Sequence, residues 1–336
     1  MQIHFIVPEG VDDPTRPSGG NTYDRRVRDG LVAQGWLVHE HPVRGAALAD
    51  VLERIPDGAV VLLDGLIASP APAVLVPQSE RLRQVVLVHM PFAHRRERDV
   101  LAAATDVVTT SAWTQRRLGE LYGLPPERVH VAEPGVDAAQ PLPGTAAGSE
   151  LLCVAAVTRR KGHDVLLDAL AALPDLAWQC TCVGSLDVDP AFAAAMQRRA
   201  GRVRFPGPRT RPRLDHAYAA ADLLVLASHA ETYGMVITES LAHGVPVLAT
   251  DIGGVTEALG HGDDDTRPGL LVPPGDAATL ASALHAWLTD SDLRARLRRA
   301  ARERRATLRA WSDTTADVAR VLAQVEARDG LAAVAR

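Results

Sequence analysis

Short apolar runs alternate with amphipathic stretches along the first half of the chain. Strand-like runs of five to eight residues, rich in Val, Ile and Leu, fall at 3–8, 36–43, 59–65, 84–90, 107–111 and 129–135. Sequences of helical period, such as NTYDRRVRDGLVAQG and AWTQRRLGELYG, lie between them. Strands that alternate with helices are typical of a parallel sheet covered by helices.

The alternation restarts after a loop rich in Pro, Gly and Ala at 137–150, which we interpret as a linker. The second set of strand-like runs falls at 150–157, 176–184, 202–207, 222–228, 246–251 and 269–274. From residue 277 onward the sequence is helical in pattern and rich in Ala and Arg. The pattern predicts an α/β protein with two open parallel sheets and a cleft between them, with ligands at the carboxyl ends of the strands.

Composition excludes several classes of protein. The 336 residues carry a formal net charge of −5, whereas nucleic-acid-binding domains have a basic surface. Three cysteines are too few for a disulfide framework, and we interpret Cys180-Thr-Cys182 as part of a buried strand, because no second Cys/His pair supports a zinc site. The N-terminus does not have the pattern of a signal peptide, and no apolar run of about 18 residues predicts a membrane span, so we expect a cytoplasmic protein.

A glycine-rich turn, Ser18-Gly19-Gly20, directly precedes the first helical sequence. Glycines let backbone amides approach a phosphate closely, and a helix N-terminus favours an anion. The turn is not a G-x-G-x-x-G motif, and Ser-Gly-Gly-Asn equally suits a surface loop. These residues alone leave both interpretations open.

Lys161 is the only lysine in a chain that uses arginine for its other 35 basic side chains, 36 minus one. It lies in VTRRKGHD, between a predicted strand and a predicted helix. An ammonium group is a compact point charge that suits a phosphate, whereas a guanidinium imposes a planar fork. We therefore interpret Lys161 as a phosphate ligand; the alternative is a solvent-facing lysine.

Two glutamates lie in the segment HAETYGMVITESLAHGVPVLATDIGGVTE. Glu231 falls in a loop after a strand, Gly234 permits a tight turn into a helix, and Glu239 lies about one turn inside that helix. Amides at the start of the helix can hold a diphosphate, while each carboxylate accepts hydrogen bonds from sugar hydroxyls. One carboxylate is expected at the reacting sugar and the other at a ribose.

His89 ends the apolar strand VVLVHM. It is either a core histidine with its own hydrogen bonds or a residue of the cleft. The adjoining run AHRRERD (93–99) is either a solvated helix face or a basic patch that meets an acidic acceptor or a membrane surface.

Taken together, these motifs resemble the retaining GT-B glycosyltransferases of family four. The resemblance covers nearly the whole chain and is strongest from Leu151 to Pro274. Its most specific element is Glu231 and Glu239 with seven residues between them, followed by AHGVPVLATDIGGVTE. Other matching segments are RKGHDVLLDAL, GLLVPPGD, SGGNTYDRRV, LVHMPF and VVTTSAWTQRRL.

The resemblance implies a GT-B architecture of two Rossmann-like domains that face a central cleft. Residues 1–140 would form the acceptor domain and residues 149–310 the donor domain. The helix at 311–336 would cross back to the first domain. Lys161 would bind the donor diphosphate, Glu231 the transferred sugar and Glu239 the ribose hydroxyls. The further implied contacts are the backbone of Tyr233, Gly234, Met235 and Val236 with phosphate and sugar oxygens, Gly19 and Gly20 with the diphosphate, and His89 with the sugar near the reacting carbon.

One departure from the family pattern affects the diphosphate site. The family usually has an arginine five residues before the lysine, and that position is Ala156 here. Arg159 and Arg160 lie closer to Lys161, and either can replace the missing charge. The sequence does not decide between them.

The activity implied by the resemblance is retaining transfer of a hexose from a nucleotide-diphosphate sugar to a hydroxyl acceptor by a front-face route. A UDP-sugar is the preferred donor and a GDP-sugar the alternative. We expect no metal and no cofactor beyond the donor. Donor and acceptor are small molecules, while membrane-surface association and oligomeric state stay open. The alternatives are a GT-B sugar-nucleotide epimerase and a non-catalytic nucleotide-sugar-binding protein. A nicotinamide-dependent dehydrogenase is disfavoured because no G-x-G-x-x-G follows a strand.

Overall fold

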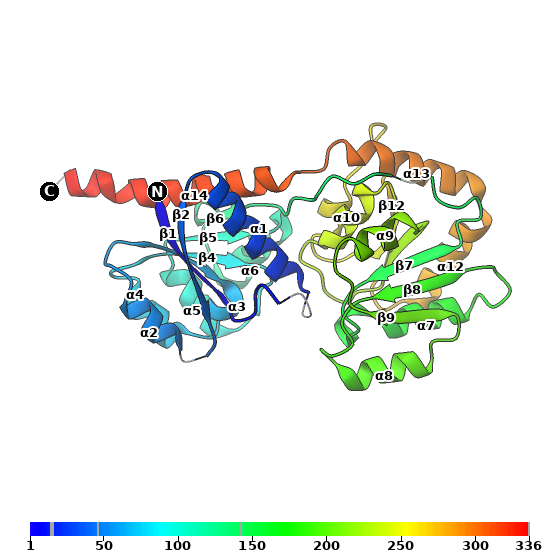
Figure 1. Cartoon of the computed structure of the whole chain (residues 1–336), viewed down its shortest axis with the longest axis horizontal. Helices are drawn as coiled ribbons and strands as arrows, with labels where there is room; N and C mark the ends of the chain where they lie inside the picture. The colour runs from blue at the N-terminus through cyan, green and yellow to red at the C-terminus, as the bar shows by residue number, and fades with distance from the viewer. Residues whose placement is uncertain (14–16, 46, 142, 335–336) are drawn as a thin grey trace. The chain divides into compact units, whose positions relative to one another are not determined.

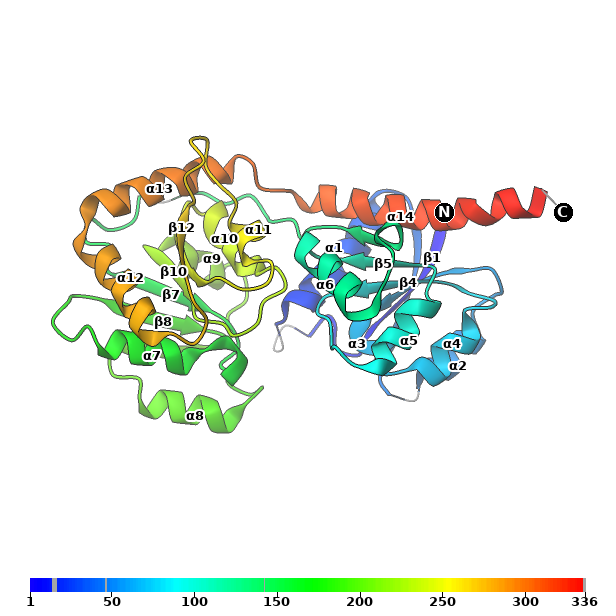
Figure 2. The same cartoon turned by 180° about the vertical axis from the view of Figure 1, so that it is seen from behind.

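The computed structural model describes residues 1–13, 17–45, 47–141 and 143–334, and Figures 1 and 2 show it from opposite sides. The chain divides into two compact units. The first comprises Met1–Asp13, Ser18–Gly135 and Arg309–Arg336, and the second consists mainly of Val136–Leu308. The last helix therefore groups with the first unit, although it follows the second unit in sequence.

The first unit is a six-stranded parallel sheet with the strand order β2-β1-β3-β4-β5-β6. Its strands are β1 (Gln2–Pro8), β2 (Leu37–Val43), β3 (Val60–Asp64), β4 (Arg83–Val88), β5 (Asp106–Thr109) and β6 (Val129–Val131). Its helices are α1 (Gly19–Ala33), α2 (Ala47–Glu53), α3 (Gly65–Ala68), α4 (Pro72–Gln78), α5 (Arg95–Ala103), α6 (Ala112–Tyr122), the 3-10 helix η1 (Pro126–Arg128) and α14 (Trp311–Val334).

Helices cover this sheet on both faces. One core layer joins apolar side chains of α1 and α14, including Val27, Leu31, Val318 and Leu322, to the strands. The two helices run side by side in Figures 1 and 2. A second layer, from α2, α4, α5 and α6, covers the other face. Because both faces are covered, β3 and β5 are buried along their whole length, which explains their nearly continuous apolar sequences.

The second unit has a six-stranded parallel sheet with the order β12-β11-β10-β7-β8-β9. Its strands are β7 (Glu150–Val154), β8 (Gln179–Val183), β9 (Val203–Gly207), β10 (Leu223–Leu226), β11 (Val247–Thr250) and β12 (Gly269–Val272). Its helices are η2 (Arg159–Lys161, a 3-10 helix), α7 (His163–Ala171), α8 (Pro190–Arg198), α9 (Arg213–Ala219), α10 (Met235–Ala242), α11 (Val255–Leu259), α12 (Ala277–Thr289) and α13 (Ser291–Arg305).

The strand order reverses between β7 and β10. From β7 the chain proceeds outward through β8 and β9, and from β10 it proceeds in the other direction through β11 and β12. Open α/β sheets bind ligands at such a switch point, outside the carboxyl ends of the strands. The loops that follow β7 and β10 are therefore the expected binding loops of this unit.

Each of the twelve predicted strand segments overlaps a strand, and the α/β prediction is confirmed. The interpretation of Cys180-Thr-Cys182 as buried strand is also confirmed for the two cysteines, which lie in β8. The sequence after residue 277 is less uniform than predicted, because the chain leaves the helical conformation between α13 and α14. Among the described helices, none has both the length and the apolar character needed to cross a bilayer.

Candidate functional site

The Lys161 turn lies at the carboxyl end of β7. Residues Arg159–Lys161 form the short helix η2, and Gly162 then adopts a left-handed conformation with φ of 64° before α7 begins. A Cβ at position 162 would lie 1.9 Å from the carbonyl oxygen of Ala227, so only glycine lets this turn pack against the segment after β10. The His229 N–H donates a 2.8 Å hydrogen bond to the carbonyl of Arg160 and joins the same two loops.

Lys161 and Glu231 form an ion pair across the switch point. The ammonium Nζ lies 2.5 Å from Oε1 of Glu231, and the Ser228 hydroxyl donates to the same oxygen at 2.8 Å. The side chains are 19% and 10% exposed, respectively. The structure thus brings together two of the predicted site residues, one from each of the two binding loops. It also shows that Lys161 is not a free surface cation.

Two glycines after β11 fit tightly against the Glu231 loop. A Cβ on Gly253, whose φ is 60°, would lie 1.6 Å from the carbonyl oxygen of Glu231. A Cβ on Gly254 would lie 2.2 Å from that of Thr232. These glycines fix the Glu231 backbone, and the sequence signal for them is the pair in DIGGVTE.

Glu239 belongs to a different network from Glu231. Gly234, with φ of 90°, precedes α10, and Glu239 lies inside that helix, where its side chain is 15% exposed. Its carboxylate accepts a hydrogen bond of 2.7 Å from the Tyr218 hydroxyl and one of 3.1 Å from Arg211. Burial raises the pKa of Glu239, and the Arg211 charge and the Tyr218 hydrogen bond oppose that rise. Neither Arg211 nor Tyr218 was predicted as a site residue from the sequence.

The structure places the two arginines beside Lys161 differently. The guanidinium of Arg159 lies over the Phe192 ring, 5.2 Å from its centroid, and the residue is exposed. Arg160 is also exposed, and its carbonyl joins the turn to the His229 loop. A third arginine, Arg211, contacts the predicted site residue Glu239.

In the first unit, the glycine-rich turn meets His89. Ser18 caps α1 by accepting a 3.0 Å hydrogen bond from the Asn21 N–H, so Gly19 and Gly20 form the first turn of the helix. A Cβ at position 20 would lie 3.2 Å from Cδ2 of His89. Gly20 therefore lets the helix start close to the imidazole, which follows β4.

Two buried carboxylates hold the His89 ring. Its Nε2 lies 2.9 Å from Asp24 Oδ1 and 3.5 Å from Asp64 Oδ2, and both aspartates have fully buried side chains. Burial alone would lower the pKa of His89, but the two carboxylates raise it to about 10. Burial raises the pKa of Asp24 to about 7 despite the nearby imidazole. His89 is therefore an imidazolium at neutral pH.

Asp24 and Asp64 were not identified from the sequence, although each left a signal. Asp24 lies four residues after Gly20, which places both on one face of α1. Asp64 is the last residue of β3, the strand next to β4. Polar residues at carboxyl ends of neighbouring parallel strands meet at one edge of the sheet.

The basic run at 93–99 exposes its arginines and buries one acid, which leaves both interpretations of the run open. Arg95 and Arg96 are exposed in α5, whereas Glu97 is fully buried. The Glu97 carboxylate accepts hydrogen bonds from the N–H groups of Phe92 and Ala93 at 2.7 and 3.2 Å. Glu97 therefore fixes the loop that follows His89, a structural role that its basic neighbours concealed.

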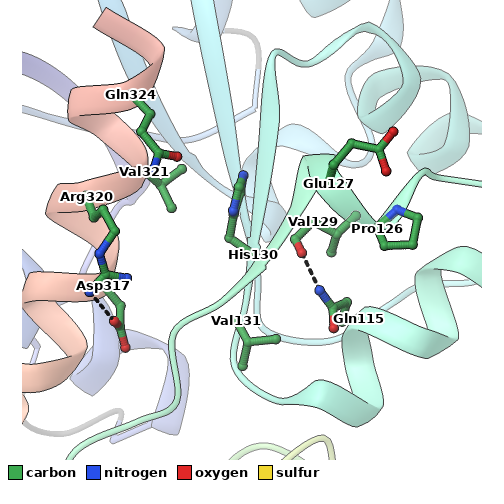
Figure 3. A pocket seen from close by; sticks show the side chains of 10 residues that line it. All are labelled: Gln115, Pro126, Glu127, Val129, His130, Val131, Asp317, Arg320, Val321 and Gln324. Atoms are coloured by element: carbon green, nitrogen blue, oxygen red, sulfur yellow. Dashed lines mark hydrogen bonds and ion pairs between the residues drawn. The ribbon is translucent and has the colours of Figure 1, made fainter. Parts of the chain in front are cut away.

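A separate cavity of about 370 Å³ lies between β6 and α14 of the first unit (Figure 3). Figure 3 shows His130 near its centre, with Gln115 on one side and the Asp317–Arg320 ion pair on the other. None of the predicted site residues lines it. We therefore assign the candidate site to the strand ends described above and not to this cavity.

Two family models match the chain. Residues 147–304 match the model described as "Glycosyl transferases group 1", and residues 15–140 match "Glycosyltransferase Family 4". Two Rossmann-like sheets with binding loops at their carboxyl ends define the class of GT-B glycosyltransferases. The chain belongs to family four of this class, the glycosyl transferases of group 1, which confirms the resemblance.

Curated relatives and solved structures agree with that assignment. The D-inositol 3-phosphate glycosyltransferase of Jonesia denitrificans is 34% identical over 66% of this chain and 57% of its own length, and that of Thermobispora bispora is 35% identical over 67% and 57%. The chain thus spans little more than half the length of these relatives. The sucrose-phosphate synthase structure from Thermosynechococcus elongatus superposes with a TM-score of 0.79 at 22% identity, covering 98% of this chain and 100% of that one. Anabaena HepE in complex with UDP-glucose gives 0.75 at 19% identity, over 96% and 100%, and these likenesses confirm the GT-B fold.

Proposed function

We propose that this chain is a glycosyltransferase that moves a sugar from a nucleotide-diphosphate sugar to a hydroxyl acceptor. The observation that carries the proposal is the Lys161–Glu231 pair at the switch point of the second sheet. It places a cation and a hydrogen-bond acceptor side by side, as a diphosphate and its attached sugar require. Family membership supports the proposal.

Each donor group has a proposed partner in the second unit. Lys161 binds the diphosphate, and the backbone at the start of α10 contributes N–H groups to phosphate and sugar oxygens. Glu231 accepts hydrogen bonds from the transferred sugar, and Glu239 accepts them from the ribose. The proposed backbone contacts are those of Tyr233, Gly234, Met235 and Val236. For Arg159 and Arg160, exposure near the turn supports a diphosphate contact.

The proposed rate acceleration is electrostatic. Cleavage of the bond between the anomeric carbon and the diphosphate leaves negative charge on the departing phosphate. The Lys161 ammonium and the start of α10 stabilise that charge, so we propose a metal-independent reaction. We also propose retention of configuration by front-face attack, in which the leaving phosphate accepts the acceptor's proton. UDP is the proposed nucleotide of the donor.

His89 has a proposed role at the transferred sugar. Its two aspartates keep the imidazole protonated and fixed in orientation, so it donates rather than accepts hydrogen bonds. We propose that Gly19 and Gly20, next to this ring, contact the diphosphate. We infer that the imidazolium contributes a second positive charge to donor binding.

For the acceptor we propose a small polyhydroxylated molecule. The relatives are named for D-inositol 3-phosphate, which makes that compound the first acceptor to test. Because this chain spans little more than half of their length, its own acceptor is not fixed by their names.

The test incubates the purified chain with UDP- and GDP-hexoses, with and without acceptor, and follows free nucleotide and product anomers by NMR. The proposal predicts acceptor-dependent release of nucleotide, an anomeric configuration equal to that of the donor, and no loss of rate with a chelator. Inverted product would overturn the front-face route. An epimerised donor formed without acceptor would identify an epimerase, and binding without turnover a nucleotide-sugar-binding protein.

A further inference from the structure

All three cysteines of the chain gather in one place in the second unit. Cys180 and Cys182 are two residues apart on β8 and so point to the same face of the sheet. Cys153 on β7 lies directly opposite Cys182 in the parallel register. Each of the three is about 1% exposed. The packing thus concentrates the chain's soft ligand atoms in the core of the donor unit.

A histidine completes the cluster. His163 is the first residue of α7 and is 1% exposed. Its Nε2 lies 3.8 Å from Cys153 Sγ, and the ligand atoms of Cys153, Cys182 and His163 all lie within 4.8 Å of one another. The sequence offered no second Cys/His pair beside Cys180 and Cys182; the fold supplies one.

Ordinary core packing leaves this histidine unexplained. Among the residues that the structure describes, Nδ1 of His163 has no hydrogen-bond partner, and Nε2 faces a sulfur atom. A buried polar group without a partner costs about 1–3 kcal/mol. A metal ion shared by Nε2 and the sulfurs accounts for the direction in which the ring faces the thiols.

The distances suit one tetrahedral zinc ion. A sulfur at about 2.3 Å and a nitrogen at about 2.0 Å from the same ion lie about 3.5 Å apart. The observed sulfur–nitrogen distance of 3.8 Å is longer by only about 0.3 Å. Cysteine thiolates and histidine nitrogens are also the ligands that zinc commonly has in proteins.

We propose that Cys153, His163 and Cys182 bind a structural zinc ion in the core of the second unit. The ion joins β7, β8 and the start of α7, two residues after Lys161. On binding, each coordinated thiol releases its proton to solvent. The ligands are closed off from solvent, so the ion is acquired as the unit folds and takes no part in sugar transfer. The inference does not depend on the proposed function.

The test measures metal in the full chain. Wild type is refolded from denaturant with Zn²⁺, dialysed, and analysed for zinc, with His163→Gln as the ligand variant and His285→Gln, an exposed histidine of α12, as the matched control. We expect about one zinc per chain in wild type and control, and at least a tenfold lower content in His163→Gln. Equal zinc content in His163→Gln and wild type would overturn the site.

A second measurement covers the case in which the variant does not fold. Wild type refolded with Co²⁺ in place of Zn²⁺ should show a thiolate-to-cobalt charge-transfer band and the visible bands of tetrahedral cobalt. Zinc uptake at surface histidines gives no thiolate band, so its absence from folded wild type would overturn the proposal without any variant. Chelator present during refolding should lower the yield of folded chain when the ion is structural.

Discussion

Replacement of Lys161 by methionine tests the central pair of the proposed site. The methionine side chain would preserve the apolar stem and remove the charge, leaving Glu231, which is 10% exposed, with the Ser228 hydroxyl. Breaking a buried pair costs about 3–5 kcal/mol, and because both side chains are slightly exposed we expect about 2–3 kcal/mol. For a unit of this size, that corresponds to a Tm lower by roughly 4–12 °C.

Donor affinity should fall as well. A hydrogen bond from a charged group contributes about 1.5–3 kcal/mol, so a loss of about 2 kcal/mol weakens UDP-sugar binding roughly 30-fold. Lys161→Arg keeps the charge beside Glu231 but replaces a point charge with a planar fork. We therefore expect it to retain most of the stability and to lose about tenfold in donor affinity.

Calorimetry measures both quantities, by thermal unfolding of the donor-free chain and by titration with UDP-sugar. Arg199→Met is the matched control, because it breaks the exposed Arg199–Asp168 pair of the same unit, where exposed pairs contribute about 1 kcal/mol or less. If Lys161→Met binds UDP-sugar within twofold of wild type while remaining folded, Lys161 is not a phosphate ligand. If its Tm matches that of Arg199→Met, the Lys161–Glu231 pair contributes no more to the free energy of unfolding than an exposed ion pair does.

Three further changes test other parts of the two units. Asp24→Asn removes a carboxylate from His89, whose pKa is raised to about 10 from an ordinary 6.5. The stability that the protonated ring contributes is complete below pH 6.5 and is lost as the pH rises through 10. In the variant, NMR titration should therefore show the His89 ring losing its proton at a lower pH than in wild type. Arg211→Met should raise the pKa of Glu239 further, because it removes the positive charge that lowers this pKa in wild type. In competition assays, the variant should lose more affinity for nucleotides with ribose than for those with 2′-deoxyribose. Gly162→Ala should destabilise the second unit by about 2–4 kcal/mol in denaturant unfolding, because its Cβ would lie 1.9 Å from a carbonyl oxygen at φ of 64°. Gly201→Ala is the control: at an open turn, it should cost about 1 kcal/mol.

The sequence predicted the elements well because their signals are local. The runs around β3, β10 and β11 are nearly continuously apolar, as is typical of strands buried on both faces, and they form where the pattern placed them. Lys161 and Glu231 were identifiable because a lone lysine and a glutamate beside a glycine turn both follow strands. Their direct contact was not predictable, since it depends on the β7–β10 adjacency that only the strand order reveals.

The residues that sequence analysis missed have only weak local signals. Asp24 looks like one more charge on an amphipathic helix, and Glu97 like one more charge in a basic run, yet both are buried. What distinguishes them is a partner distant in sequence: His89 lies 65 residues from Asp24, and Ser69 lies 28 residues from Glu97. Periodicity cannot identify a buried charge when its compensating group belongs to another element.

Ala156 stands where the family pattern has an arginine, so the proposed diphosphate site must draw its positive charge from other residues. Arg159 lies over an aromatic ring, and Arg211 neutralises Glu239, so neither guanidinium is free of a partner. Lys161 shares its charge with Glu231. His89 differs from all of these, because two buried aspartates keep it protonated while its ring stays 16% exposed. If donor binding needs a second positive charge, the imidazolium can supply it, and an enzyme built this way should lose donor affinity on Asp24→Asn even though Asp24 never touches the donor.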